Sequence, residues 1–183
     1  MNIIVMKFGG TSVATVEKIR KVAKTVKAES INNKIVVILS AMAGVTNELQ
    51  SFINKVDFKA PMEADLILTS GEQVTIGLLS MLLKKEGIKS IPLLGWQIPI
   101  VTDEHHEKGR ILNINNENLT KYFESNDVIV LAGFQGISTH GYITSLGRGG
   151  SDTTAVAIAS SIKADRCDIY TDVDGVYTTD PNI

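Results

Sequence analysis

The sequence predicts an α/β fold with a largely parallel β-sheet, and three observations support that class. Short, β-branched apolar runs alternate with segments in which apolar residues recur at helical spacing, as in consecutive β-α-β units. The runs are nearly continuous in apolar character, which is expected of strands covered on both faces. Glycine-containing turns follow several of the runs. We therefore expect ligands to bind at the strand ends, as in other α/β sheets.

The predicted strands are short, and in order along the chain they span residues 2–8, 34–40, 89–94, 127–133 and 167–171. Between the first two strands, a helix is indicated by apolar residues at helical spacing with Lys and Arg between them. These apolar residues are Val16, Ile19, Val22, Ala23 and Val26.

A long amphipathic helix is predicted after Ser70-Gly71-Glu72, and it ends at basic residues followed by Gly87, as helix C-termini often do. Its expected inward stripe consists of Val74, Leu78 and Leu82, widened by Leu79 and Leu83. A last helix, over about 153–162, is expected to face inward through Ala155, Ile158, Ala159 and Ile162. Residues 102–118, rich in charge, His and Asn, are expected to form a long surface loop.

The composition is that of an ordinary globular domain, with 183 residues, of which 44% are hydrophobic and 21% charged. A net charge of −2 gives no electrostatic reason to expect nucleic acid or an anionic membrane as a partner. The apolar stretches are too short to span a bilayer, and the first residues lack a signal-peptide pattern. The single cysteine, Cys167, fits a reducing cytoplasm. We expect one domain of a cytoplasmic protein.

Lys7 precedes two glycines at the end of the first predicted strand, in the motif KFGGTS. Glycine lets backbone N–H groups approach an anion, and a fixed lysine can neutralise charge on a transferring phosphoryl group. Because the lysine comes before the glycines, the motif is not a P-loop. Taken alone, it is equally compatible with a tight turn and a surface lysine.

Two further turns carry polar residues. The segment SAMAGVTN, which contains Ser40 and Thr46, follows the second strand, and its small and hydroxyl side chains allow close approach of a polar ligand. Glu72 opens the long helix, where an acidic residue is also favoured simply by the helix dipole.

Arg148 stands among three glycines in LGRGGSDTT, at the start of the last helix. This pattern makes a flexible backbone nest whose guanidinium can hold a carboxylate with two hydrogen bonds. A helix N-cap role is the alternative for Ser151 and Asp152. The segment fails as a dinucleotide-binding fingerprint because Asp152 occupies the place of the third glycine.

No metal site is expected from the protein's own side chains. The D-x-D-G core of YTDVDGVY, residues 170–177, lacks the remaining ligand spacing of a calcium loop. His105 and His106 have no third ligand at a usable spacing, and we interpret them as loop residues. Cys167 is interpreted as a small core residue.

As an ordered set, KFGGTS, SAMAGVTN, SGE, GFQG, SLGRGGSDTTA and YTDVDGVYTTDP resemble the motifs of aspartokinases, over the whole chain. Aspartokinases are amino-acid kinase superfamily members, so the resemblance implies a three-layer α/β sandwich with an open, mainly parallel sheet. It implies ATP-dependent phosphorylation of the β-carboxylate of L-aspartate, the first step toward lysine through diaminopimelate and toward threonine and methionine. It also implies ATP and Mg²⁺ as cofactors and a homo-oligomeric assembly.

The resemblance implies a role for each motif residue. Arg148 would clamp the α-carboxylate of aspartate and Glu72 would face its ammonium. Lys7 would neutralise the phosphoryl group and Asp152 would orient the lysines. The other substrate-binding residues would be Ser40, Thr46 and Ser151. The phosphoryl oxygens would meet the N–H groups of Gly9 and Gly10. The nucleotide would contact Lys7, Gly10, Thr171, Asp172, Asp174 and Tyr177. A carboxylate nucleophile is ionised at neutral pH, with a pKa of about 4, and needs no general base.

Two features depart from the family pattern. Asn182 stands where aspartokinases commonly have an arginine that reaches the nucleotide phosphates. The sequence stops at Ile183, whereas complete aspartokinases continue through the rest of the nucleotide-binding half and regulatory ACT domains. We therefore expect residues 1–183 to be a catalytic domain that is incomplete at its C-terminus and lacks ACT domains, with exposed strand edges and apolar surface.

Two other functions remain open on the sequence alone. One is another carboxylate or nucleotide kinase of the superfamily, such as an acetylglutamate or uridylate kinase. The other is a non-catalytic fragment that binds aspartate. An N-acylated substrate would offer no cation to Glu72, so the acidic residue favours a free amino acid.

Overall fold

A computed structural model describes residues 1–171 of the chain. Its central sheet, sheet A, has the strand order β3-β6-β2-β1-β9, and every pairing in it is parallel. The strands are β1 (Asn2–Phe8), β2 (Asn33–Leu39), β3 (Ser90–Leu93), β6 (Val128–Ala132) and β9 (Arg166–Tyr170). The five predicted strands and the parallel sheet are thereby confirmed.

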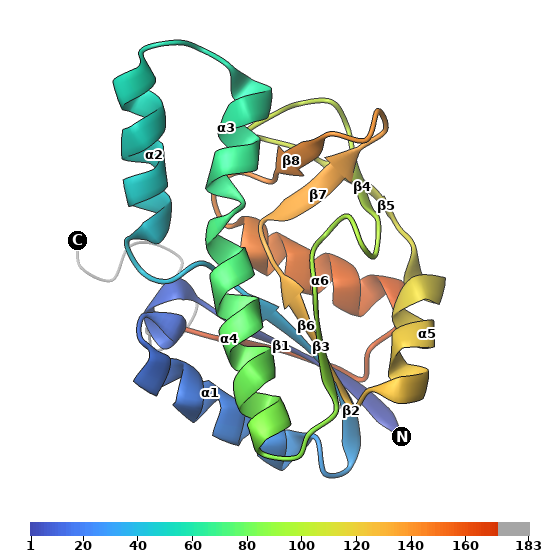
Figure 1. Cartoon of the computed structure of the whole chain (residues 1–183). Helices are drawn as coiled ribbons and strands as arrows, with labels where there is room; N and C mark the ends of the chain where they lie inside the picture. The colour runs from blue at the N-terminus through green and yellow to red at the C-terminus, as the bar shows by residue number, and fades with distance from the viewer. Residues whose placement is uncertain (172–183) are drawn as a thin grey trace, which may run out of the picture.

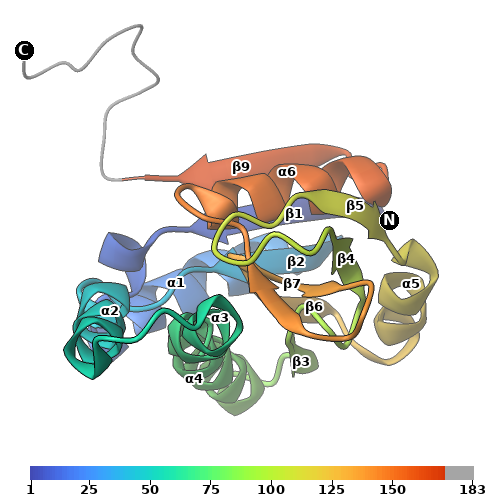
Figure 2. The same cartoon turned by 90° about the horizontal axis from the view of Figure 1, so that it is seen from above.

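Helices cover both faces of sheet A and complete the predicted three layers (Figures 1 and 2). One face packs on α1 (Val16–Glu29) and α4 (Gly71–Lys85), and the other on α5 (Asn116–Ser125) and α6 (Gly150–Ser161). Each face of sheet A has its own hydrophobic core, and alternate residues of each central strand point into one core or the other. Met6 belongs to the core on the α1 and α4 face, and Val5 to the core on the α5 and α6 face. Both side chains are fully buried, as expected of a parallel strand inside a sandwich.

A second, smaller sheet, sheet B, has the order β5-β4-β7-β8 and mixes parallel and antiparallel pairs. Its strands are β4 (Ile100–Thr102), β5 (Ile111–Ile114), β7 (Gln135–Ser138) and β8 (Ile143–Ser145). Figure 1 shows it beside α3 (Pro61–Leu68), which α2 (Val45–Val56) precedes. Neither this sheet nor helices α2 and α3 were predicted from the sequence.

The expectation of one long loop over residues 102–118 was wrong. Strand β5 lies within this segment, and α5 begins at its end, where the Asn115 side chain caps the helix by accepting a hydrogen bond from the Asn118 N–H at 3.4 Å. Only residues 103–110 form the expected loop.

Two predicted core positions were also wrong. Val74 is 55% exposed, because α4 turns Ile76, Leu79 and Leu83 toward the sheet. Cys167 is exposed because β9 is an edge strand of the described sheet, paired only with β1 there.

Within the 25-residue stretch Pro61–Lys85, a window of 18 residues has a mean hydropathy of 1.5, so the stretch is long and apolar enough to cross a membrane by length and composition alone. Half of that window is buried inside the protein, and core helices of soluble proteins share these properties. The stretch is apolar because it carries apolar residues both on its buried side, such as Leu79, and on its exposed side, such as Met81.

Candidate functional site

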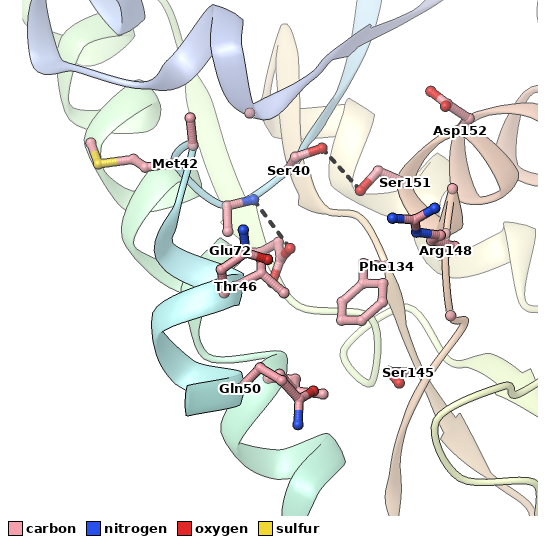
Figure 3. Close-up of a pocket in the computed structure, with 18 of the residues that line it drawn as sticks. Ser40, Met42, Thr46, Gln50, Glu72, Phe134, Ser145, Arg148, Ser151 and Asp152 are labelled. Carbon is pink, nitrogen blue, oxygen red and sulfur yellow. Dashed lines mark hydrogen bonds between the residues drawn. The ribbon is translucent and has the colours of Figure 1, made fainter. Parts of the chain in front are cut away.

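Loops at the carboxyl ends of β1, β2 and β8 enclose a cavity of about 670 Å³ with parts of α2, α4 and α6 (Figure 3). Strands β1 and β2 belong to the parallel sheet A, and ligands of α/β proteins bind at the carboxyl ends of such strands. The cavity collects these predicted site residues: Lys7, Gly10, Ser40, Thr46, Glu72, Arg148, Ser151 and Asp152.

Lys7, at the end of β1, and Asp152, in the first turn of α6, form an ion pair. Lys7 Nζ lies 2.6 Å from Asp152 Oδ1, and the lysine side chain is 11% exposed. Gly9 lies beside the ammonium, since a Cβ at that position would be 3.6 Å from Nζ. The result is a localised positive charge next to glycine backbone, which suits a phosphoryl group.

Gly10 joins the first loop to the second. Its carbonyl oxygen accepts a hydrogen bond from the Ala43 N–H at 3.2 Å, and a Cβ at Gly10 would lie 3.0 Å from the Ala41 carbonyl oxygen. A larger residue would therefore push the two loops apart.

Glu72 is 3% exposed and reaches the cavity from the first turn of α4. Its Oε1 accepts a hydrogen bond from the Ala41 N–H at 3.1 Å, whereas Oε2 is buried and has no hydrogen-bond partner among residues 1–171. Burial raises the pKa of the Glu72 carboxyl to about 7. A buried carboxylate oxygen without a partner is costly, so this atom is suited to receive a cationic group from a ligand.

Hydroxyl groups lie between Glu72 and the far side of the cavity. Ser40 Oγ donates to Ser151 Oγ at 3.1 Å, which links the end of β2 to α6. Gly133 makes room for this pair, because a Cβ there would approach Ser151 Oγ to 2.9 Å. Thr46, in the first turn of α2, also lines the cavity.

Arg148 lies on the opposite side of the view in Figure 3 from Glu72, with Ser40 and Ser151 between them. Gly147 and Gly149 flank it, each with a φ of 72°, a left-handed conformation that favours glycine. Gly149 is the N-cap of α6, so the alternative N-cap role for Ser151 and Asp152 was wrong. Within residues 1–171 the exposed guanidinium has no ion pair or side-chain hydrogen bond, which leaves its donors available to an anion.

Several cavity residues were missed by sequence reasoning. Phe134 has a φ of 68°, and its ring packs so closely on Gly150 that a Cβ there would be 2.9 Å away. It belongs to the GFQG motif, which offered a usable indication. Glu107 and Lys108 come from the loop 103–110, where nothing in the local sequence indicates a site.

Two of the predicted nucleotide contacts, Lys7 and Gly10, line this cavity, whereas Thr171 does not. Thr171 lines a second cavity of about 510 Å³, together with Thr11, Lys18 and the stacked rings of Phe8 and Tyr170, whose centroids are 4.4 Å apart. Asp172, Asp174 and Tyr177, like Asn182, lie outside the described residues.

Among residues 1–171, no group of three His, Cys, Asp or Glu side chains could hold a metal ion. His105 instead pairs with Asp103 at 3.0 Å, and His106 with Asp65 at 2.8 Å.

Curated proteins whose sequences are similar to this chain are named aspartate kinase or aspartokinase. The chain is 51% identical to the aspartate kinase of Pseudomonas putida and 49% identical to the aspartokinase of Rickettsia felis, in each case over the whole chain. It covers 45% and 47% of those proteins, so it spans a little under half the length of these curated relatives.

Solved structures agree with this comparison. The aspartate kinase from Synechocystis superposes with a TM-score of 0.80 at 43% identity, over 98% of this chain and 30% of that one. Aspartokinase III from E. coli, in complex with aspartate and ADP, gives a TM-score of 0.81 at 25% identity, over 98% of this chain and 51% of that one. The sequence model of the amino acid kinase family matches residues 2–183, and with this fold and these loops the chain belongs to that family.

Proposed function

We propose that the cavity binds L-aspartate and that the protein transfers the γ-phosphoryl group of ATP to the side-chain carboxylate of this amino acid. The observation that carries the proposal is the buried Oε2 of Glu72, which has no partner among residues 1–171, in a cavity that also presents the Arg148 guanidinium, unpaired within the same residues. An acceptor for a cation and a donor for an anion in one cavity match the ammonium and α-carboxylate of a free amino acid.

In this arrangement the substrate is bound at both ends of its backbone. The ammonium pairs with Glu72, and the α-carboxylate with Arg148. The hydroxyls of Ser40 and Ser151 lie between these two groups, and Thr46 also lines the cavity. The β-carboxylate is then directed toward Lys7, which lines the cavity beside Gly9.

The chemical step needs no proton transfer. A β-carboxylate oxygen attacks the γ-phosphorus, the bond between that phosphorus and the bridging oxygen breaks, and the electron pair leaves on ADP. Lys7 would neutralise charge on the transferring group, and the N–H groups of Gly9 and Gly10 would receive its oxygens. Asp152 would hold the lysine in place through the 2.6 Å ion pair.

ATP would enter beside the glycine loop, with contacts from Thr171, Asp172, Asp174 and Tyr177. Mg²⁺ would be held chiefly by the phosphate oxygens and water, as is common for this ion, because residues 1–171 contain no acidic cluster able to bind it alone. We assign residues 1–183 to a kinase catalytic domain in a cytoplasmic homo-oligomer that acts early in the biosynthesis of lysine, threonine and methionine.

The comparisons support this proposal in two ways. The relatives at 49–51% identity are named aspartate kinase or aspartokinase, and the E. coli aspartokinase III structure is of a complex with aspartate and ADP. Kinases that use an N-acylated substrate are disfavoured, because such a substrate would leave Glu72 Oε2 unpaired in its buried position.

Trapping of the acyl phosphate tests the proposal. The protein is incubated with ATP, Mg²⁺, L-aspartate and hydroxylamine, and aspartyl hydroxamate is measured for the wild type and for Lys7→Met. We expect product from the wild type and a loss of about 100-fold or more in the variant. Binding of aspartate without turnover would instead identify a non-catalytic aspartate-binding protein, and binding of neither ligand would contradict the proposal.

A further inference from the structure

A second buried carboxylate, Asp65, lies on α3 outside the cavity and is fully buried. Three donors from other segments meet it. His106 Nδ1 is 2.8 Å from Oδ2, the Glu107 N–H donates to both oxygens at 3.0 and 3.1 Å, and the Ser145 hydroxyl donates to Oδ1 at 2.5 Å. A buried carboxylate is stable only with such partners. Asp65 thus joins α3, the loop 103–110 and β8.

Asp65 holds the loop in a conformation that the loop would not favour alone. Glu107 has a φ of 65°, which is uncommon for a residue with a side chain. Its N–H points to Asp65, and two residues later the Gly109 N–H donates to the Ser145 carbonyl at 2.8 Å. The loop is therefore fastened to α3 before Lys108 and to β8 after it.

The same loop supports the Arg148 segment. A Cβ at Gly147 would lie 3.1 Å from the carbonyl oxygen of Glu107, so the peptide after Glu107 packs directly on Gly147. Glu107 therefore contacts both sides: its N–H donates to Asp65, and its carbonyl packs on Gly147. A shift of that residue would move the support of Arg148.

We infer that Asp65, together with His106 and Ser145, is a positioning unit that sets the place of Arg148 by fixing Glu107 against Gly147. The inference rests on the proposed function in one respect, which is that Arg148 binds the α-carboxylate of the substrate. Neither Asp65 nor His106 lines the cavity, so both act through Arg148 and do not touch the reacting atoms.

Three substitutions of His106 distinguish the effect of its hydrogen bond to Asp65 from the effect of its side-chain volume. In His106→Asn the amide nitrogen can take the place of Nδ1 and restore the donor to Asp65. In His106→Gln the amide nitrogen falls near the position of Nε2 and the donor is lost, as it is in His106→Ala. His105→Ala is the matched control, because His105 is 80% exposed and pairs with Asp103. Thermal unfolding shows which variants fold; if His106→Ala does not, His106→Gln is used in its place.

The first measurement needs no substrate. We expect amide hydrogen exchange of the peptide that covers residues 145–150 to be about 10-fold or more faster in His106→Ala and His106→Gln. It should be at the wild-type rate in His106→Asn and His105→Ala. Unchanged exchange in the folded His106→Ala or His106→Gln variant would overturn the inference, whatever the protein binds.

The second measurement is the dissociation constant for L-aspartate by calorimetry, in a double-mutant cycle with Arg148→Ala. We expect His106→Ala to weaken aspartate binding about 10-fold, through misplacement of the guanidinium, with ATP binding within about 2-fold of wild type. In the Arg148→Ala background, the His106 substitution should have no further effect. Independent, multiplicative losses would overturn the inference and leave the proposed function standing, whereas a wild type that does not bind aspartate would contradict the proposed function itself.

Discussion

Lys7 Nζ and Asp152 Oδ1 lie 2.6 Å apart and join the end of β1 to the first turn of α6. The pair fixes the ammonium beside Gly9 and so determines where a phosphoryl group can be neutralised. Asp152 is 47% exposed, so its value to folding is small. We conclude that the pair serves to place the lysine.

Replacement of Asp152 by Asn should therefore reduce turnover far more than stability. We expect kcat for hydroxamate formation to fall about 100-fold, with a change in the free energy of unfolding below about 1 kcal/mol. Asp168→Asn is the matched control, because Asp168 pairs with Arg166 at 2.8 Å on the exposed edge strand. Equal effects of the two substitutions on kcat would argue against the assigned role of Asp152.

Glu72 should make the stability of the ligand-free protein fall as the pH rises from about 4.5 to about 7. In this window the folded protein holds a proton on Glu72 and the unfolded chain does not, so each pH unit lowers the free energy of unfolding by about 1.4 kcal/mol, or about 3 kcal/mol in total. Glu72→Gln cannot ionise and should lack this component. Denaturant unfolding between pH 5 and pH 8 measures the free energy of unfolding of both proteins. The same dependence on pH in the wild type and in Glu72→Gln would contradict the raised pKa.

Arg148→Lys should weaken aspartate binding although the charge is kept, because an ammonium cannot form the two parallel hydrogen bonds of a guanidinium with a carboxylate. We expect the KM for aspartate to rise about 10-fold with the KM for ATP nearly unchanged. The exposed Arg110, the last residue of the loop 103–110, does not line the cavity and offers the control Arg110→Lys. A rise in the KM for ATP alone would place Arg148 on the nucleotide instead.

Gly10→Ala should reduce activity by separating two loops. Its Cβ would meet the Ala41 carbonyl at 3.0 Å and the Ala43 nitrogen at 3.4 Å, and both are backbone atoms that move only with the loop. Gly77→Ala provides the contrast, since a Cβ at this α4 position meets nothing within 4 Å and should raise stability by about 0.5–1 kcal/mol. Steady-state kinetics and thermal unfolding of both variants test this pair, and a fully active Gly10→Ala would show that the loop spacing is not required.

The sheet was predictable because its strands are apolar along their whole length, as in Ile35–Leu39, where all five residues are fully buried. The orientation of α4 was not predictable, because the helix is apolar on more than one side and the sheet selects Leu79 and Leu83 over Val74. Helix α2 has no fully buried residue in the described structure. The strands of sheet B are only three or four residues long, so these elements depend on tertiary pairing.

The same distinction applies to the site. Residues that directly follow a strand or open a helix, such as Lys7, Ser40 and Glu72, were found because parallel strands end at one edge. Lys108 lies at the cavity in a loop that is fastened by Asp65, some forty positions away in the chain. Contacts of this kind have no local sequence pattern.

The central claim is that the buried Oε2 of Glu72 receives the ammonium of a free amino acid. Calorimetric titration of the wild type and of Glu72→Gln with L-aspartate and with N-acetyl-L-aspartate tests it most directly. We expect the wild type to bind L-aspartate at least about 10-fold more tightly than the acetylated compound, and the variant to lose most of this preference. Equal affinity of the wild type for the two compounds, or an unchanged preference in Glu72→Gln, would contradict the claim.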